Sequence, residues 1–401
     1  MMNYDPARQG PLAGIKIVDL SRLIAGNMMS QQLGDFGADI IKVEPPEGDP
    51  LRHWLVKGTP FYWKAYGRNK RSIALNLREP AELDALLRIL DTADVFIENF
   101  RPGTLEKMGL APDLLLKRNP GLVIVRISGF GQTGPYAQLP GFGTLVEALS
   151  GLAARTGFPD REPVLPPTAL ADMLAGIHGA MAVMIALHSR DLGKSAGQVI
   201  DLSLLEPLVS ILGPEAAIYR ATGTVLPRVG SGSNTSAPRN VYRCADGKYI
   251  ALSGSIQSMA FRIFDMIGRP DMKTDPRFST NAARIQNREL VDEAVGGWFA
   301  ARSRDEAIEA IHDAEVTAGP IFDGADIVND PHFREREVLV EMEDRDLGSL
   351  PLHAITPRLS ETPGVWRRPA PELGEHTREI LAEAGLPPSA IDAITSRKDV
   401  A

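Results

Sequence analysis

The chain has 401 residues, of which 44% are hydrophobic, and its formal net charge is −8 at pH 7. This size and composition predict a globular protein of two or three domains, and the acidic balance argues against a nucleic-acid partner. A single cysteine, Cys244, excludes an intramolecular disulfide and fits a reducing cytoplasm. The sequence shows no metal-ligand spacing, no signal peptide and no apolar stretch of membrane-spanning length. We therefore expect a cytoplasmic protein without a metal or a membrane partner.

The first half of the chain alternates short β-rich runs with helical patterns. Strands are predicted at residues 15–20, 38–44, 71–77, 94–98, 122–127 and 197–203. Helical spacing covers 28–36 and 80–92, and a further helix begins near Asp172. Strands separated by helices imply a parallel sheet covered on both faces, whose ligands bind beyond the carboxyl ends of the strands. The first strand is not followed by the GxGxxG fingerprint of dinucleotide binding.

The second half begins with a long predicted helix from Leu204 to Ala221. The stretch from Pro227 to Pro238 is rich in Gly, Ser and Asn and has no apolar face, so we interpret it as a mobile linker or an active-site flap. A hairpin over 241–253 and several helical patterns follow, and together they predict a smaller α+β domain. Strand-like residues 338–342 and a helix over 375–384 complete the chain.

Asp172 stands at the start of an apolar helix built of small residues. A carboxylate there should point out of the helix N-terminus, among free N–H groups that favour its ionised form. Ala175, Gly176 and Gly179 keep side-chain bulk low, so that a large ligand or another backbone can come close. The combination suits a carboxylate nucleophile, and an N-cap is the alternative role.

Three loops have the composition of ligand-binding segments. The loop Gly67–Ser72 holds Arg68, Lys70 and Arg71, which either bind phosphates or form an ordinary charged surface. After the fourth strand, Asn99, Phe100 and Arg101 offer an amide, an apolar face and a cation, the mixture that an adenine ring and a pyrophosphate need, although a plain turn would also explain them. The glycine-rich loop 128–136 includes Gly129 and Gly131, whose backbone amides could approach an acyl or phosphate oxygen.

These pieces together resemble the family III CoA-transferases, the group that includes formyl-CoA, carnitine and bile-acid CoA-transferases. The matching stretches run in order through residues 10–19, 25–26, 34–45, 68–72, 98–103, 128–136, the Asp172 segment and 373–377. The resemblance implies an α/β fold with a Rossmann-like large domain, a smaller α+β domain and an interlocked homodimer. The predicted domains are a large CoA-binding domain at 1–222, a small domain at 223–332 and a C-terminal segment at 333–401 that returns to the large domain.

The resemblance also assigns site residues. Asp172 falls on the catalytic aspartate. The positions that the resemblance implies to contact CoA are Leu23, Ile24, Ala25, Lys70, Asn99, Phe100 and Arg101. Arg71 is added to them from the basic loop. Candidates for a flap or for oxyanion-binding amides are Gly129, Gly131, Gly230 and Gly232. No metal and no prosthetic group is expected, since coenzyme A enters as part of the substrate.

The implied activity is CoA transfer from a donor acyl-CoA to an acceptor carboxylic acid, through a mixed anhydride and an aspartyl-CoA thioester on Asp172. The related α-methylacyl-CoA racemases need a proton-shuttling pair where this chain has Phe142 and Gly143, neither of which can exchange a proton. A non-catalytic CoA-binding protein is the third possibility. Arg155 and Arg161, near the uncharged stretch 140–144, are compatible with a dicarboxylate substrate such as succinate, mesaconate or citramalate.

Overall fold

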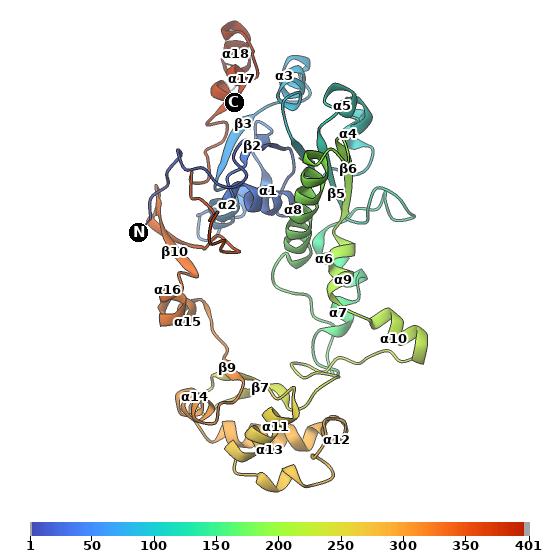
Figure 1. Ribbon diagram of the computed structural model, residues 1–401, viewed down its shortest axis with the longest axis vertical. Coiled ribbons are helices and arrows are strands. Elements are labelled where there is room, and N and C mark those ends of the chain that lie inside the picture. The colour runs from blue at the N-terminus through green and yellow to red at the C-terminus, as the bar shows by residue number, and fades with distance from the viewer. Residues whose placement is uncertain (1, 397–401) are drawn as a thin grey trace. The chain divides into compact units, whose positions relative to one another are not determined.

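The computed structural model describes residues 2–396, which divide into two units (Figure 1). The first unit contains residues 1–150, 166–211 and 335–401 within this description, and the second contains 151–165 and 212–334. The second unit is thus inserted into the first. Relative to the predicted domains, residues 151–165 and 212–222 belong with the smaller unit instead of the larger one.

A six-stranded parallel sheet is the centre of the first unit. Its strands, in the order β3-β2-β1-β4-β5-β6, are β1 (Lys16–Asp19), β2 (Asp39–Glu44), β3 (Lys70–Ala74), β4 (Val95–Glu98), β5 (Val123–Ser128) and β6 (Gln198–Ser203). This is the order of doubly wound dinucleotide-binding sheets, so the predicted parallel α/β architecture is confirmed. The order reverses between β1 and β4, and in such sheets the ligand-binding crevice opens at that reversal.

Helices of the first unit pack against this sheet and against one another. They are α1 (Ala25–Asp35), α2 (Phe61–Tyr66), α3 (Pro80–Leu90), α4 (Thr104–Lys107), α5 (Pro112–Arg118), α6 (Gly143–Leu149), α8 (Leu170–Asp191) and α9 (Leu205–Ile211), with a short 3₁₀ turn η1 (Pro50–His53). Gly176 and Gly179 of α8 face α1 so closely that a side chain at either position would overlap Met28 or Met29. The small residues of α8 therefore admit another backbone, that of α1.

Helix α8 corrects one expectation from the sequence. With 22 residues it is long and apolar enough to cross a membrane by length and composition, whereas no such stretch was expected. Packing within the first unit explains part of this composition, since Ala175, Gly176, Gly179 and Val183 are buried there, whereas Ile177, Met181 and Ile185 are exposed. A core helix passes the same test as a membrane span, so this single helix is weak evidence for one.

The C-terminal segment returns to the first unit. It contains a hairpin of β10 (Leu339–Asp344) and β11 (Gly348–His353), then α17 (Thr377–Glu383) and α18 (Pro388–Thr395). Figure 1 shows α17, in red, close to the blue strand β3. Trp63 Nε1 donates to the Pro371 carbonyl at 3.1 Å, and Asn69 Nδ2 donates to the Val365 carbonyl at 2.9 Å.

The second unit has its own core around Phe264, Val295 and Phe299. An antiparallel sheet of β7 (Arg239–Arg243), β8 (Tyr249–Ser253) and β9 (Ala318–Pro320) includes the predicted hairpin. Its helices are α7 (Leu152–Arg155), α10 (Glu215–Thr222), α11 (Gln257–Met266), α12 (Asn281–Gln286), α13 (Arg288–Ala300), α14 (Arg304–Asp313), α15 (Gly324–Asn329) and α16 (Pro331–Glu335), with a 3₁₀ turn η2 (Pro270–Lys273).

The prediction of one helix from Leu204 to Ala221 is wrong. The chain forms α9 and α10 instead, separated at Gly213 and Pro214. Gly213 has a φ of 75°, a left-handed conformation that interrupts a right-handed helix, and Pro214 cannot continue the hydrogen bonding of the preceding turn. This break coincides with the passage from the first unit to the second.

Candidate active site

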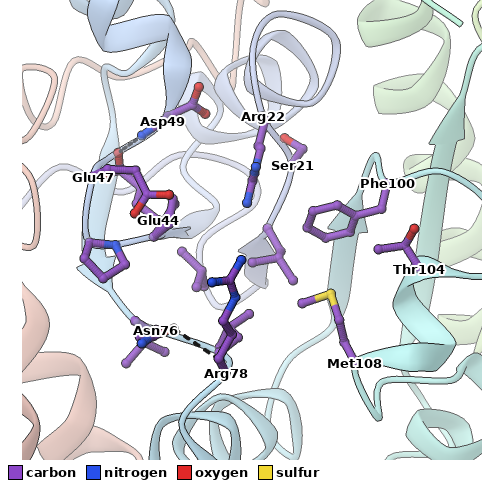
Figure 2. A pocket seen from close by; sticks show the side chains of 16 residues that line it. Ser21, Arg22, Glu44, Glu47, Asp49, Asn76, Arg78, Phe100, Thr104 and Met108 are labelled. Atoms are coloured by element: carbon purple, nitrogen blue, oxygen red, sulfur yellow. Dashed lines mark hydrogen bonds between the residues drawn. The ribbon is translucent and has the colours of Figure 1, made fainter. Parts of the chain in front are cut away.

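A pocket of about 490 Å³ lies at the carboxyl edge of the sheet, in the first unit (Figure 2). Residues that follow β1, β2, β3 and β4 contribute to it, so it lies beside the reversal of strand order between β1 and β4. Its lining includes Ser21, Arg22, Glu44, Glu47, Asp49, Asn76, Arg78, Phe100, Thr104 and Met108. This is the place where a doubly wound sheet binds a nucleotide.

Two cations and one aromatic ring give this pocket its chemistry. Figure 2 shows the guanidinium groups of Arg22 and Arg78 directed into the pocket, with Phe100 on the side of α4. The Arg22 guanidinium carbon lies 5.6 Å from the centre of the Phe100 ring. Both arginines are exposed, and neither forms an ion pair within residues 2–396. A phosphate-bearing ligand with an aromatic base matches this set of groups.

Asn99 holds the loop that carries Arg22. Its side-chain oxygen accepts the Arg22 N–H at 2.8 Å, and its side-chain amide donates to the Arg22 carbonyl at 2.7 Å. The next residue, Leu23, has a φ of 62°, which is unusual for a side-chain-bearing residue. Asp49 accepts the Leu23 N–H at 3.0 Å, and the Asn27 amide donates to the Leu23 carbonyl. These contacts fix the path of the β1–α1 loop.

Lys70 and Arg71, predicted to contact CoA, have other partners in this structure. The Lys70 amino group is fully buried and donates to Asn27 Oδ1 at 2.8 Å, with Asp19 at 3.5 Å. Burial lowers the pKa of Lys70 to about 8, against the opposing effect of Asp19. The Arg71 guanidinium pairs with Asp39 and with Glu379 and Glu383 of α17. Both cations therefore join elements of the first unit, and Arg101 remains exposed.

Asp172 is the third residue of α8 and is partly exposed. Gly143, the first residue of α6, lies directly against its carboxylate, so a side chain at position 143 would overlap Asp172 Oδ2. One turn further along α6, Glu147 Oε1 accepts the N–H of Ala171 at 3.2 Å. The first turn of α8 is thus enclosed by α6, and the Phe142 side chain is 61% exposed.

The electrostatics of Asp172 differ from the expectation that free N–H groups favour its ionised form. Burial is the largest influence and, with the negative charge of Glu147, raises the pKa of Asp172 to about 6, against the lowering effect of its own backbone N–H. One of the N–H groups counted as free, that of Ala171, is occupied by Glu147. Asp172 is still mostly ionised at pH 7, but in an environment that disfavours the charge.

The β1–α1 loop connects the pocket to the neighbourhood of Asp172. Leu20, Ser21 and Arg22 line the pocket, while Ile24 belongs to an apolar cluster with Met173, the residue after Asp172. The Ala25 carbonyl lies beside Gly176, one turn along α8. The predicted contacts Leu23, Ile24 and Ala25 therefore lie between the nucleotide-type pocket and the candidate nucleophile.

The four predicted oxyanion glycines lie in two different units. In the first, Gly129 packs against Gly141, and the Gly131 N–H donates to Ser128 Oγ at 3.0 Å. In the second, the Gly230 N–H donates to the Gly157 carbonyl and the Gly232 N–H to the Val229 carbonyl, each at 2.9 Å. The amides of Gly131, Gly230 and Gly232 thus already have partners.

The two arginines considered for a dicarboxylate, Arg155 and Arg161, also belong to the second unit. Arg155 approaches Glu215 at 3.4 Å, and Arg161 lies over the Phe158 ring.

Sequence analysis missed three residues that the structure brings to these sites: Arg22, Arg78 and Glu147. Arg22 and Arg78 follow the predicted strands 15–20 and 71–77, so their position beyond the carboxyl ends of parallel strands was a usable signal. Glu147 lies in α6, a helix that the sequence analysis did not predict, and its proximity to α8 is a tertiary contact that spacing alone does not reveal.

Comparison with known proteins supports the resemblance seen in the motifs. Residues 12–377 match CoA-transferase family III. The chain is 37% identical over 387 residues to the succinyl-CoA–D-citramalate CoA-transferase of Chloroflexus aurantiacus, with 96% of each chain covered. It is 38% identical over 380 residues to the beta subunit of that organism's succinyl-CoA–L-malate CoA-transferase, covering 93% of this chain and 94% of the relative.

Among solved structures, a CAIB/BAIF family protein from Brucella suis matches with a TM-score of 0.83 and 33% identity, over 94% of this chain and 100% of that one. The match extends across the whole of the known structure, and the sequence relatives are covered almost completely as well. The chain therefore belongs to family III of the CoA-transferases and is a CoA-transferase, an enzyme whose substrates are CoA thioesters.

Proposed function

We propose that this enzyme transfers CoA from a donor thioester to an acceptor carboxylate by covalent catalysis on Asp172. One Asp172 oxygen attacks the thioester carbonyl, the C–S bond breaks, and a mixed anhydride and a CoA thiolate form. The thiolate then attacks the aspartyl carbonyl, releasing the donor acid as a carboxylate and leaving an aspartyl-CoA thioester. The acceptor carboxylate reverses these steps. One thioester replaces another, so the exchange is near energy balance and needs no external energy source.

The observation that carries this proposal is the setting of Asp172. Its side chain is partly exposed at the start of α8, and burial together with the charge of Glu147 raises its pKa to about 6. A more basic carboxylate is a better nucleophile, and it remains ionised at neutral pH. Gly143 leaves one face of the carboxylate free of any side chain.

We further propose that the pocket beside Arg22, Arg78 and Phe100 holds the nucleotide end of CoA. Two guanidinium groups without an ion pair among the described residues suit its phosphates, and the Phe100 ring suits a purine. The pantetheine arm would then follow the β1–α1 loop past Leu23 and Ile24 toward Asp172. Asn99 supports this arrangement through its two bonds to the Arg22 main chain.

For substrates we propose succinyl-CoA as donor and a four- or five-carbon dicarboxylate as acceptor. The named relatives use succinyl-CoA with D-citramalate and with L-malate. A panel of succinyl-CoA, acetyl-CoA and oxalyl-CoA against a range of mono- and dicarboxylic acids, with mass spectrometry of the CoA products, identifies the pair. A strong preference for monocarboxylic acids would contradict the substrate proposal while leaving the mechanism intact.

The mechanism is tested by trapping the adduct. The enzyme is mixed with succinyl-CoA, treated with borohydride and digested, and the peptide containing Asp172 is analysed by mass spectrometry. Borohydride reduces the thioester at the side-chain carboxyl carbon of Asp172 and so converts the residue to homoserine. Homoserine is expected in the wild type and absent in Asp172→Asn. Full transferase activity in Asp172→Asn would refute the mechanism.

A racemase function is less well supported. Two-base proton exchange needs a second base that can reach the substrate α-carbon. Gly143, which touches Asp172 from the start of α6, has no such group, and Glu147 is buried and accepts the Ala171 N–H. Washing of solvent deuterium into the acyl α-position without CoA exchange would favour the racemase instead.

We propose a homodimer located in the cytoplasm, and the interlocked form follows from the family resemblance. In support, Ile177, Met181 and Ile185 form an exposed apolar stripe on α8, with 49%, 55% and 63% of their surfaces accessible. A stripe of this kind on a stable enzyme is typical of a subunit interface. The buried free thiol of Cys244 agrees with a reducing compartment. Light scattering of the purified enzyme should give twice the chain mass.

A further inference from the structure

A second carboxylate, Glu147, is buried beside the candidate nucleophile. Its side chain is only 3% exposed, and Oε1 accepts the N–H of Ala171, the residue directly before Asp172. Glu147 and Gly143 lie one helical turn apart on α6, so both face the first turn of α8. Within residues 2–396, Glu147 forms no ion pair with a lysine or an arginine.

Burying a carboxylate without a neighbouring cation costs free energy unless hydrogen bonds or dipoles compensate its charge. The Ala171 N–H provides one hydrogen bond and the positive end of the α8 dipole provides some compensation. Without Glu147, the Ala171 N–H and the positive end of the α8 dipole would both stabilise the Asp172 carboxylate instead. Glu147 therefore acts on Asp172 in two ways, by occupying a neighbouring N–H group and by adding a negative charge.

Several titratable groups on α8 and on the elements packed around it have partners of their own. They are Glu206 of α9, Arg126 of β5, Asp201 of β6, Asp35 of α1, Lys64 of α2 and His178 of α8 itself. Tyr66 of α2, which packs in the apolar cluster with Met173, has its pKa raised by burial and stays neutral. The negative charge of Glu147 contributes to the raised pKa of Asp172.

We propose that Glu147 is a positioning residue whose charge disfavours the free Asp172 carboxylate and thereby promotes its conversion to the covalent aspartyl-CoA thioester. The inference rests on the covalent mechanism proposed above. In that step Asp172 changes from an anion to a neutral acyl group, while the departing donor acid carries the negative charge away. The repulsion at α8 is relieved when the adduct forms and returns when the adduct is consumed.

The test uses the full-length enzyme with Glu147→Gln. Glutamine keeps a side-chain oxygen for the Ala171 N–H and removes only the charge. The acidic inflection of kcat/KM, near pH 6 in the wild type, is expected to move down by about one pH unit. The fraction of enzyme present as trapped thioester, at equilibrium with succinyl-CoA and succinate, is expected to fall by up to about tenfold. The substrates titrate identically in both enzymes, so only the difference between the profiles counts.

Glu147→Asp is the conservative control, since it keeps the charge and should keep the inflection near its wild-type position. If Glu147→Gln does not fold, Glu147→Met, an uncharged side chain of similar length, serves for the same comparison. An unchanged inflection and an unchanged adduct fraction in the uncharged variant would overturn the proposal. A wild-type enzyme that transfers CoA but yields no adduct on Asp172 would instead overturn the covalent mechanism, so the two failures are distinguishable.

Discussion

The side chain of Asn99 closes a two-bond ring with the main chain of Arg22, accepting at 2.8 Å and donating at 2.7 Å. The two residues follow β4 and β1, the strands between which the sheet order reverses. An asparagine predicted to contact the ligand therefore also determines where a neighbouring cation lies.

Asn99→Ala is expected to raise KM for the acyl-CoA by about 5- to 30-fold with little change in kcat, because two hydrogen bonds to the Arg22 loop are lost far from the reacting atoms. Steady-state kinetics with varied acyl-CoA measures this split. Asn119→Ala is the matched control: Asn119 also bonds to main-chain carbonyls, those of Leu90 and Ala93, but it precedes β5 at the opposite edge of the sheet. An equal rise in KM in the control would contradict the role given to Asn99.

Lys70→Met is expected to lower the free energy of unfolding by about 3 to 5 kcal/mol, because it removes a buried cation that faces Asp19 and Asn27. Urea denaturation at pH 7 measures the loss. Arg22→Gln should behave in the opposite way, with unchanged stability and a raised KM for acyl-CoA, since its guanidinium is exposed in the pocket. A stable Lys70→Met enzyme with a raised KM would instead support the direct CoA contact implied by the family resemblance.

Gly143→Ala is expected to lower kcat by roughly 100-fold, because the new methyl group would displace the Asp172 carboxylate that lies against this position. The comparison variant is Gly324→Ala, since Gly324 also opens a helix but has open space where its side chain would stand. Single-turnover kinetics with succinyl-CoA would show whether the loss lies in adduct formation. Wild-type kcat in Gly143→Ala would mean that the Asp172 side chain has room to move.

Asp172→Asn is expected to abolish transfer and also to stabilise the protein at neutral pH. The folded-state pKa of Asp172, about 6, lies above its ordinary value of 3.8, so the fold binds the extra proton between these pH values. The contribution of Asp172 to stability should therefore become less favourable by about 2 kcal/mol as pH rises from about 4 to about 6, and the difference between variant and wild type isolates it. Asparagine carries no such penalty, so the variant should exceed the wild type by that amount at pH 7 and match it at pH 4. Urea titrations at both pH values test this, and equal stabilities at pH 7 would contradict the raised pKa.

Much of the first unit could be predicted because its information is local. Runs such as Val95–Glu98 and Val123–Ser128 are mainly apolar and rich in β-branched residues, and helices between them leave few arrangements other than a parallel sheet. The start of the Asp172 helix was also predictable, since it depends on adjacent residues. The residues that break the helix, Gly213 and Pro214, are also local signals, but they stand inside an apolar pattern that is continuous enough to predict one helix.

The candidate site was harder to predict because residue type does not reveal partners. Lys70 and Arg71 are the cations that a sequence pattern favours for phosphates, yet carboxylates from distant segments already hold them. Arg22 and Arg78, less conspicuous in the sequence, line the pocket at the sheet edge and form no ion pair within residues 2–396. The environment of Asp172 depends on Glu147, which approaches only through tertiary packing.

The insertion of one unit into the other has a consequence for how the chain is made. Residues 212–334 leave the ribosome before the segment that provides Val365, Pro371 and the α17 carboxylates to the first unit. During synthesis the early strands therefore lack their contacts with the C-terminal segment, including those of Arg71 with Glu379 and Glu383. The inserted unit can already form its own core at that stage. Nascent chains halted before residue 365 should consequently be protease-sensitive in their N-terminal half.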